Sequence, residues 1–341
     1  MNGKSDKIRV ALVYGGRSGE HEISIRSAQS VKRALDLRKY ELSEFLIGHD
    51  GKWDPRPIVP EPGANPGMDI VIPMLHGTFG EDGTVQGLLE LAELPYVGAG
   101  VLASALSMDK GLTKKVCREA GLPVVEHLVL IGDQAASGTF ELPFSFPVFV
   151  KPANLGSSVG ITKARDWREL RHGIELAAQY DRKIIVERGI EGREFECAIL
   201  GGDEPIASVP CEIIPSKEFY TYEDKYLLQD AVIELPAKLT ADQTTRVQRL
   251  ALACFDVVNC EGMARVDFLM DGQTGELFIN EINTIPGFTP TSMFPKMWEY
   301  SGIPYSELLD RLIRLGLERS EKRRQIRYSR EESSIAERTV S

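Results

Sequence analysis

The chain has 341 residues, 43% of them hydrophobic, and a formal net charge of −10 at pH 7. That length is too great for one small hydrophobic core and predicts two or three domains of about 100 to 150 residues each. The acidic balance argues against a general nucleic-acid-binding protein, because binding to phosphates requires a concentrated positive surface.

Cysteine content and hydropathy argue against a secreted or membrane protein. The apolar run at residues 8–14 is short, and no run elsewhere approaches the roughly 18 apolar residues that a membrane helix needs. A scattered set of cysteines without a Cys-x-x-Cys pair predicts neither a disulfide framework nor a thiolate metal site. We therefore expect a cytoplasmic protein that binds neither nucleic acid nor a membrane. The five cysteines are Cys117, Cys197, Cys211, Cys254 and Cys260.

Residues 1–100 alternate strands and helices as in an open parallel sheet. A buried strand is predicted at 8–14, followed by a glycine-rich turn and a helix at 23–37 with Ser24 as its cap. A second buried strand at 68–75 ends before His76. Open sheets bind ligands beyond the carboxyl ends of their strands, which places Glu20 to meet a substrate ammonium group and His76 near the same site. An ordinary polar turn and a structural histidine are the alternatives.

A second domain is expected over residues 101–186. It comprises a helix at 110–120, an irregular segment up to 146, a strand at 147–151, a glycine loop and a strand from 160. Small residues in the loop, including Ser157 and Ser158, let backbone N–H groups and hydroxyls approach phosphate oxygens beside Lys151. The loop is not a Walker A motif, because no Lys-Ser or Lys-Thr closes it. A flexible hairpin loop is the alternative.

A third domain is expected over residues 187–320, with a charged tail at 321–341. A strand at 183–187 opens this region, and others are predicted at 194–200 and 206–210. The long polar segment 215–230 is predicted to be a lid, because loops of that length are commonly lids. Within it, Lys225 could close over phosphates while Tyr226 shields the reacting centre from water. A solvated charged loop is the alternative.

The most informative stretch is a predicted hairpin that joins residues 264–270 to residues 276–283. If its turn centres on Gln273, Arg265 opposes Glu281, and Asp267 is the diagonal neighbour of Glu281. Asn283 continues the same face. Two carboxylates and an amide oxygen suit Mg²⁺, and the guanidinium could stabilise an oxyanion or a phosphoryl group. A surface hairpin with solvated charges is the alternative.

Six motifs follow one another along the chain: Gly15-Gly16-Arg17-Ser18-Gly19-Glu20, Leu75-His76-Gly77, the segment 151–160, Lys225-Tyr226, Arg265-Val266-Asp267 and the segment 281–287. In this order they together resemble the D-alanine–D-alanine ligases of the ATP-grasp superfamily. The resemblance spans about residues 8–315 and implies an α/β, three-domain ATP-grasp fold whose N-terminal domain is an open parallel sheet. ATP is then expected between the central and C-terminal domains, and D-alanine where all three domains meet.

The resemblance also implies roles in binding ATP and metal. ATP phosphates would meet Lys110 and Lys151 together with the hydroxyl-rich loop that carries Ser157 and Ser158. The segment from Glu187 to Ile190 would receive adenine, and Glu194 would meet the ribose. Two Mg²⁺ (or Mn²⁺) ions would be held by Asp267, Glu281 and Asn283.

For the amino-acid substrates, the resemblance assigns Glu20 to the first ammonium group and His76 to the surroundings of the carboxylates. Ser157 and Tyr226 would be linked to Glu20 by hydrogen bonds. Arg265 and the Gly287 N–H group would form the oxyanion site. Ser292 would contact the second D-alanine, and Lys225 the phosphate.

The implied reaction forms D-alanyl-D-alanine for peptidoglycan precursors in two steps, through an acyl phosphate. No protein nucleophile is required, which agrees with a site offering Lys, Arg and metal ligands without a Ser-His pair. The Lys-Tyr pair favours D-alanine over D-lactate in the second subsite, and family resemblance implies a homodimer. The alternatives are a D-Ala-D-Lac, D-Ala-D-Ser or other ATP-grasp carboxylate–amine ligase, and a regulatory nucleotide-binding protein that does no chemistry.

Overall fold

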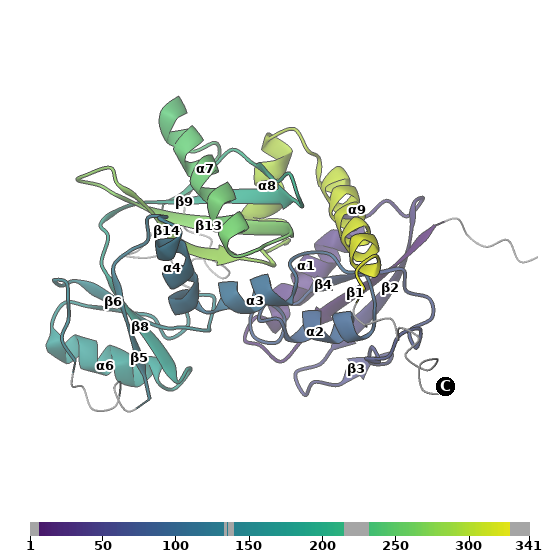
Figure 1. The fold of residues 1–341 in the computed structure, drawn as a ribbon, viewed down its shortest axis with the longest axis horizontal. Helices are drawn as coiled ribbons and strands as arrows, with labels where there is room; N and C mark the ends of the chain where they lie inside the picture. The colour runs from purple at the N-terminus through teal and green to yellow at the C-terminus, as the bar shows by residue number, and fades with distance from the viewer. Residues whose placement is uncertain (1–6, 133–134, 136–139, 215–231, 328–341) are drawn as a thin grey trace, which may run out of the picture.

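The computed structural model describes residues 7–132, 135, 140–214 and 232–327. Three β-sheets with their covering helices form three lobes (Figure 1). The predicted lid at 215–230, with Lys225 and Tyr226, lies outside the described residues, and so does most of the predicted tail. None of the described helices combines the length and apolar character needed to cross a bilayer.

The N-terminal sheet has the strand order β3-β2-β1-β4, in which β1 runs parallel to β2 and β4, and β3 pairs antiparallel at the edge. Helix α1 packs on β1, and α2 follows β4. The predicted parallel pairing of the first two buried strands is thus confirmed. The elements are β1 (Ile8–Gly15), α1 (His21–Ala34), β2 (Tyr40–Ile47), β3 (Trp53–Asp54), β4 (Ile70–Met74) and α2 (Thr84–Leu91).

Ser24 is not the cap that the sequence predicted, because α1 already begins at His21. The Ser24 hydroxyl is buried one turn inside the helix. It accepts a hydrogen bond from the Gly15 N–H group (2.7 Å) and donates to the Met74 carbonyl. Serine commonly caps a helix start, but here the ends of β1 and β4 offer the Ser24 hydroxyl both a donor and an acceptor. Ser24 therefore joins α1 to the sheet.

The central sheet has the order β5-β8-β6-β7, with every pair antiparallel, and α6 covers it. Two details differ from expectation. Residues 127–131, predicted to be irregular, form β5, and β8 lies inside this sheet between β5 and β6 instead of opening the third region. Both differences arise from pairing between segments distant in sequence. The elements are β5 (His127–Ile131), β6 (Val148–Pro152), β7 (Thr162–Ala164), α6 (Trp167–Ala177) and β8 (Lys183–Arg188).

The C-terminal sheet is antiparallel in the order β12-β11-β9-β13-β14, and β10 pairs with β9. Helix α7 begins at a capping box in which Thr240 and Gln243 exchange side-chain and backbone hydrogen bonds. The strand predicted at 206–210 is shorter in the structure. The elements are β9 (Gly192–Gly201), β10 (Ile206–Ala207), β11 (Cys211–Ile214), β12 (Val232–Glu234), α7 (Ala241–Val257), β13 (Gly262–Asp271) and β14 (Leu277–Asn283).

Four further helices connect the lobes. Helices α3 and α4 pack on α7 and β14, so part of the segment preceding the central sheet shares the C-terminal core, where Cys117 lies beside Cys254. Helix α9 contacts α1 and β4 as well as β13. One hydrophobic core therefore continues from the N-terminal sheet to the C-terminal one. These helices are α3 (Val101–Met108), α4 (Lys110–Glu119), α8 (Met293–Tyr300) and α9 (Tyr305–Arg324).

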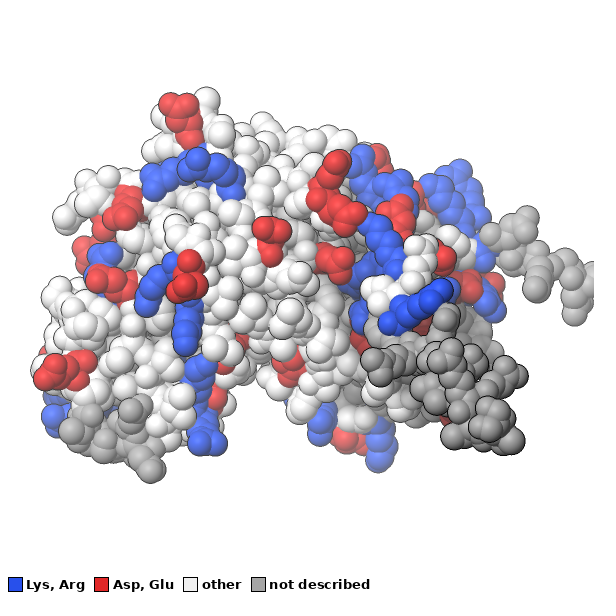
Figure 2. All heavy atoms as spheres, viewed as in Figure 1, with Lys and Arg blue, Asp and Glu red and all other residues white. Residues whose placement is uncertain are grey.

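On the face shown in Figure 2, Lys and Arg side chains are interspersed with Asp and Glu side chains. Along α9, Arg311 pairs with Glu307 (2.6 Å) and Arg314 with Glu318 (3.7 Å), one turn apart. Such exposed pairs contribute little stability individually. At the end of the helix, Lys322 pairs with Asp203 and Arg323 with Glu90, so these basic residues belong to a surface of mixed charge.

Candidate active site

Two adjoining cavities lie where the three sheets converge, and both are lined by Lys110, Ser157 and Glu281. The first cavity also receives Glu20 and His76 from the N-terminal lobe and Arg265 and Ser292 from the C-terminal lobe. The second cavity lies between the central and C-terminal sheets. This second cavity is lined by the residues that the sequence predicted to bind ATP, namely Lys110, Lys151, Ser157, Ser158, Glu187, Ile190 and Glu194.

The hairpin of β13 and β14 has a different register from the one predicted. Arg265 pairs with Asn283, and Asp267 lies directly opposite Glu281. The turn is centred half a residue later than assumed, since Asp271 pairs with Glu276. A bulge between Asp267 and Phe268 then shifts the remaining pairs. The correction brings the two carboxylates closer than a diagonal arrangement would.

Arg265 forms a bidentate ion pair with Asp267, in which the Nε–Oδ1 distance is 2.7 Å and the Nη2–Oδ2 distance is 2.6 Å. Its guanidinium also lies 3.3 Å from Glu196 on β9. Burial alone would lower the pKa of Arg265, but Asp267 and Glu196 outweigh it and hold that pKa well above its usual value. Asn283 donates its amide to Asp267 (3.1 Å). Oxygen atoms of Asp267, Glu281 and Asn283 thus lie on adjacent strands, a donor set that fits Mg²⁺.

A buried cluster of charges lines the second cavity. The Glu187 carboxylate lies 2.6 Å from the Lys151 ammonium and 3.0 Å from that of Lys114. Burial alone would raise the pKa of Glu187, but the two lysines lower it to about 2. Burial also opposes the charge on Lys151, yet Glu187 holds the pKa of Lys151 above its usual value. Lys110 lies 3.4 Å from Glu281 and donates to the Leu155 carbonyl (2.8 Å).

Lys114 was missed by sequence reasoning, although it lies one helical turn after Lys110 and so shares its face of α4. Burial lowers its pKa despite the attraction of Glu187. Ammonium groups converging on a cavity in this way can bind a polyphosphate. Through its ion pair with Glu187, Lys114 belongs to the same cluster of charges.

The glycine loop of the central lobe reaches Glu20 of the N-terminal lobe. The Ser157 hydroxyl donates to the Glu20 carboxylate, and Cβ atoms built at Gly77 and Gly156 would lie 2.6 and 3.5 Å from the same carboxylate. Ser157 and Ser158 both have left-handed backbone conformations, with φ of 55° and 59°. Such conformations are costly for serine and are found where function demands them.

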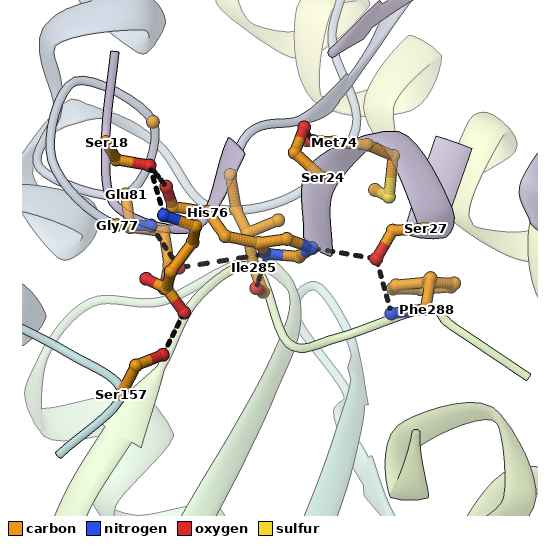
Figure 3. A network of polar contacts seen from close by, with 12 residues as sticks. Ser18, Ser24, Ser27, Met74, His76, Gly77, Glu81, Ser157, Ile285 and Phe288 are labelled. Atoms are coloured by element: carbon orange, nitrogen blue, oxygen red, sulfur yellow. Dashed lines mark hydrogen bonds and ion pairs between the residues drawn. The ribbon is translucent and has the colours of Figure 1, made fainter. Parts of the chain in front are cut away.

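His76 is buried and fixed by two hydrogen bonds (Figure 3). Its Nδ1 lies 3.1 Å from the Ile285 carbonyl, and its Nε2 lies 2.9 Å from the Ser27 hydroxyl. Because a carbonyl only accepts, Nδ1 carries the proton and Nε2 accepts from Ser27. Ser27 in turn accepts from the Phe288 N–H group (3.3 Å), at the edge of the cavity.

Glu81 was also missed, because no motif precedes it. It accepts a hydrogen bond from the Gly77 N–H group (2.9 Å) and lies 3.9 Å from His76 Nδ1. Burial, together with the charge of Glu20, raises the pKa of Glu81 to about 8, and burial lowers the pKa of His76. At neutral pH the pair is therefore uncharged, and Glu81 holds a proton close to the Glu20 carboxylate.

Gly287 and Ser292 lie together on the C-terminal side of the first cavity. The Ser292 hydroxyl accepts from the Thr289 N–H group (2.9 Å). A Cβ atom at Gly287 would lie 2.6 Å from the Ser292 hydroxyl, so only glycine fits there. The site can thus bring backbone N–H groups close to a bound carboxylate or oxyanion.

Two antiparallel sheets that meet at a lysine-lined cavity, with a parallel-sheet lobe closing one side, make this chain an ATP-grasp ligase. Family models described as D-ala D-ala ligase N-terminus and D-ala D-ala ligase C-terminus match residues 9–62 with 59–99, and 116–314, respectively. The chain belongs to the D-alanine–D-alanine ligase family, whose members are ATP-dependent. This finding confirms the resemblance and the fold predicted from the motifs.

Relatives cover almost the whole chain. The D-alanine–D-alanine ligase of Solibacter usitatus (strain Ellin6076) is 59% identical over 324 residues, covering 95% of this chain and all of the relative. The VanG D-Ala:D-Ser ligase of Enterococcus faecalis has a similar structure, with a TM-score of 0.83, 35% identity and coverage of 91% and 99%. The D-alanine–D-alanine ligase of Bacillus anthracis complexed with ATP gives a TM-score of 0.74, 28% identity and coverage of 93% and 99%.

Proposed function

We propose that this chain joins two molecules of D-alanine to D-alanyl-D-alanine at the expense of ATP, for peptidoglycan precursors in the cytoplasm. The observation that carries the proposal is the pair of adjoining cavities that share Lys110, Ser157 and Glu281. The second cavity suits a nucleoside triphosphate, and the first offers the Glu20 carboxylate for an ammonium group. A reaction between the two bound molecules needs such a shared wall. Identity of 59% to a named ligase supports the choice of D-alanine.

In the proposed reaction, a carboxylate oxygen of the first D-alanine attacks the γ-phosphorus of ATP, and ADP leaves. The amine of the second D-alanine, after losing a proton, then attacks the acyl carbon, and inorganic phosphate leaves. Glu20 holds the first ammonium group, with Ser157 orienting that carboxylate. His76 and Ser292 position the substrate carboxylates. Arg265 and the Gly287 N–H group stabilise the oxyanion at the acyl carbon.

For ATP, Lys110 and Lys151 hold the phosphates above the loop of Ser157 and Ser158. The segment from Glu187 to Ile190 receives adenine, and Glu194 meets the ribose. Asp267, Glu281 and Asn283 would hold two Mg²⁺ or Mn²⁺ ions, which neutralise phosphate charge when bound. Lys225 and Tyr226 keep their proposed roles over the phosphate and beside Glu20.

We also propose the division into an N-terminal domain (1–100), a central domain (101–186), a C-terminal domain (187–320) and a tail (321–341). Each of the first three contains one of the three sheets, apart from the end of β8. A homodimer is proposed from the family resemblance.

A D-Ala-D-Ser ligase is the second candidate, since a D-Ala:D-Ser ligase has a closely similar structure. Phosphate release should be measured with Mg²⁺ and ATP, adding D-alanine, L-alanine, D-serine or D-lactate singly, D-alanine mixed with D-serine or with D-lactate, or no substrate, with products identified by mass. We expect release with D-alanine alone and formation of the dipeptide. D-alanyl-D-serine as the main product from mixtures would favour the second candidate. Phosphate release that does not depend on any amino acid would refute both candidate functions.

The proposed metal site has its own test. Asp267→Ala and Glu281→Ala should each reduce turnover by at least about 100-fold, because phosphoryl transfer depends on metal charge. Glu276→Ala removes an exposed carboxylate from the same hairpin and should leave turnover unchanged. Circular dichroism checks that all three variants fold. Normal turnover in both site variants would contradict the assignment.

A further inference from the structure

Two histidines and a glutamate meet at the carboxyl edge of the N-terminal sheet, outside the two cavities described above. Strands β1 and β2 are parallel neighbours, so the turns that follow them leave the sheet side by side. The Gly16 N–H group donates to the Ile47 carbonyl (2.7 Å) and joins the turns. His21 and Glu22 start α1 after the first turn, and His49 lies in the second.

His21 is oriented as a metal-binding histidine would be. It is buried, with 6% of its surface exposed, and its Nδ1 lies 2.6 Å from the Gly16 carbonyl. Because the carbonyl only accepts, Nδ1 carries the proton and Nε2 presents a lone pair. Histidines that bind metals commonly donate their second N–H group to a backbone carbonyl in this way, which fixes the tautomer and the ring.

The other two side chains are close and adjustable. One ligand atom from each of His21, Glu22 and His49 lies within 4.8 Å of the other two. His49 Nε2 and the Glu22 carboxylate are 3.9 Å apart, with 70% and 73% of their side chains exposed. Ligands at about 2.1 Å from a tetrahedral metal are about 3.4 Å apart. To reach this spacing, the exposed side chains of Glu22 and His49 must move by about 1 Å, while His21 stays fixed.

The stacking of His21 and His49 brings their imidazoles together without a metal, with ring centroids 3.7 Å apart and planes inclined by 25°. Binding needs His49 to tilt out of this stack so that its lone pair points at the ion. Glu22 supplies a negative charge, which offsets the unfavourable effect of the positive end of α1 on a cation.

We propose that His21, Glu22 and His49 form a site for a transition-metal ion, with Zn²⁺ as the occupant and water completing a tetrahedron. Two imidazoles and one carboxylate suit Zn²⁺, whereas Mg²⁺ prefers oxygen ligands alone. The site is therefore chemically distinct from the one proposed for Mg²⁺ at Asp267 and Glu281. A bound ion would tie the turn after β2 to the segment that carries Glu20.

The test is calorimetric titration of the full-length protein with ZnCl₂ in excess Mg²⁺, which keeps Zn²⁺ from the oxygen-rich site. One Zn²⁺ should bind per chain. His49→Ala and Glu22→Gln should each weaken binding at least about tenfold, because each removes a ligand. His172→Ala, which removes an exposed histidine from α6, should bind as tightly as the unaltered chain. Equal binding by all four proteins, or none by the unaltered chain, would overturn the proposal.

A second readout separates binding at these ligands from adventitious binding elsewhere. Co²⁺ in place of Zn²⁺ should give the visible absorption of a tetrahedral complex with the unaltered chain and with His172→Ala. His49→Ala should lose that absorption. Without Zn²⁺, His49→Ala should retain the phosphate release of the unaltered chain, since His49 lines neither cavity. Retention of the cobalt absorption by His49→Ala would contradict the site even if ligase activity were confirmed.

Discussion

The uncharged pair of Glu81 and His76 determines which charges lie next to Glu20 in the first cavity. The carboxyl groups of Glu20 and Glu81 both line the first cavity. Burial and Glu20 raise the pKa of Glu81 to about 8. A neutral Glu81 avoids repulsion with Glu20 and adds no second negative charge beside it.

Glu81→Gln should therefore change how stability depends on pH. The pKa of Glu81 is higher in the folded chain than its reference value of 4.5. The folded state then binds more protons than the unfolded state, and its stability falls as pH rises towards about 8. Between about pH 6.5 and 8.5, the unaltered chain should lose on the order of 2 kcal/mol more than the variant.

Urea unfolding at several pH values measures this difference. Glu61→Gln, which replaces an exposed glutamate, is the control and should follow the unaltered chain. Identical pH profiles for Glu81→Gln and the unaltered chain would show that Glu81 is ionised in the folded protein.

At the scale of an element, a glycine turn decides how closely the turns after β1 and β4 of the N-terminal lobe approach each other. Gly77 follows β4 with φ of 73°, and a Cβ atom there would lie 2.6 Å from the Glu20 carboxylate. Gly63 has a similar φ of 78°, but a Cβ atom there would meet nothing within 4 Å. A residue with a side chain would be strained at either position, but only at position 77 would it also contact Glu20.

Gly77→Ala and Gly63→Ala should each destabilise the chain by about 1–2 kcal/mol, because alanine is strained in the left-handed region. Only Gly77→Ala should also displace Glu20 and raise KM for D-alanine, by about tenfold or more. Denaturant unfolding and steady-state kinetics measure the two effects separately. A similar rise in KM in both variants would mean that strain, and not contact with Glu20, is responsible.

Prediction of individual elements succeeded where a short sequence motif contains the functional residues. The hairpin of β13 and β14 was found from its alternating residues, and so was the convergence of Asp267 and Glu281. The predicted register was wrong because the turn is centred half a residue later than assumed and a bulge adds one further residue without changing the hydrophobic pattern. The partner of β8 could not be predicted, because pairing in this sheet joins segments that are distant in sequence. Lys114 and Glu81 were missed because only the folded chain brings Lys114 to Glu187 and Glu81 to the first cavity.

At the scale of the whole molecule, α9 attaches the end of the described chain to the N-terminal lobe. Arg319 is buried there, and it donates to the Gly98 and Tyr96 carbonyls while its guanidinium stacks on the Tyr96 ring at 4.2 Å. Gly98 also packs against Gly262 at the start of β13. A Cβ atom placed on Gly262 would lie 2.9 Å from the Gly98 carbonyl. The relative position of Glu20 and the C-terminal sheet therefore depends on this junction.

Arg319→Met should test that dependence. Methionine keeps much of the apolar stem but leaves two carbonyls without their donor, at a cost of about 2–4 kcal/mol. Arg314→Met, which alters a residue 65% exposed on the same helix, should cost less than about 0.5 kcal/mol. Denaturant unfolding gives both values. Because the proposed ATP cavity lies between the other two sheets, KM for D-alanine should rise several-fold in Arg319→Met while KM for ATP stays nearly constant. Equal increases in both constants would mean that the junction supports the fold as a whole and does not specifically place the N-terminal lobe.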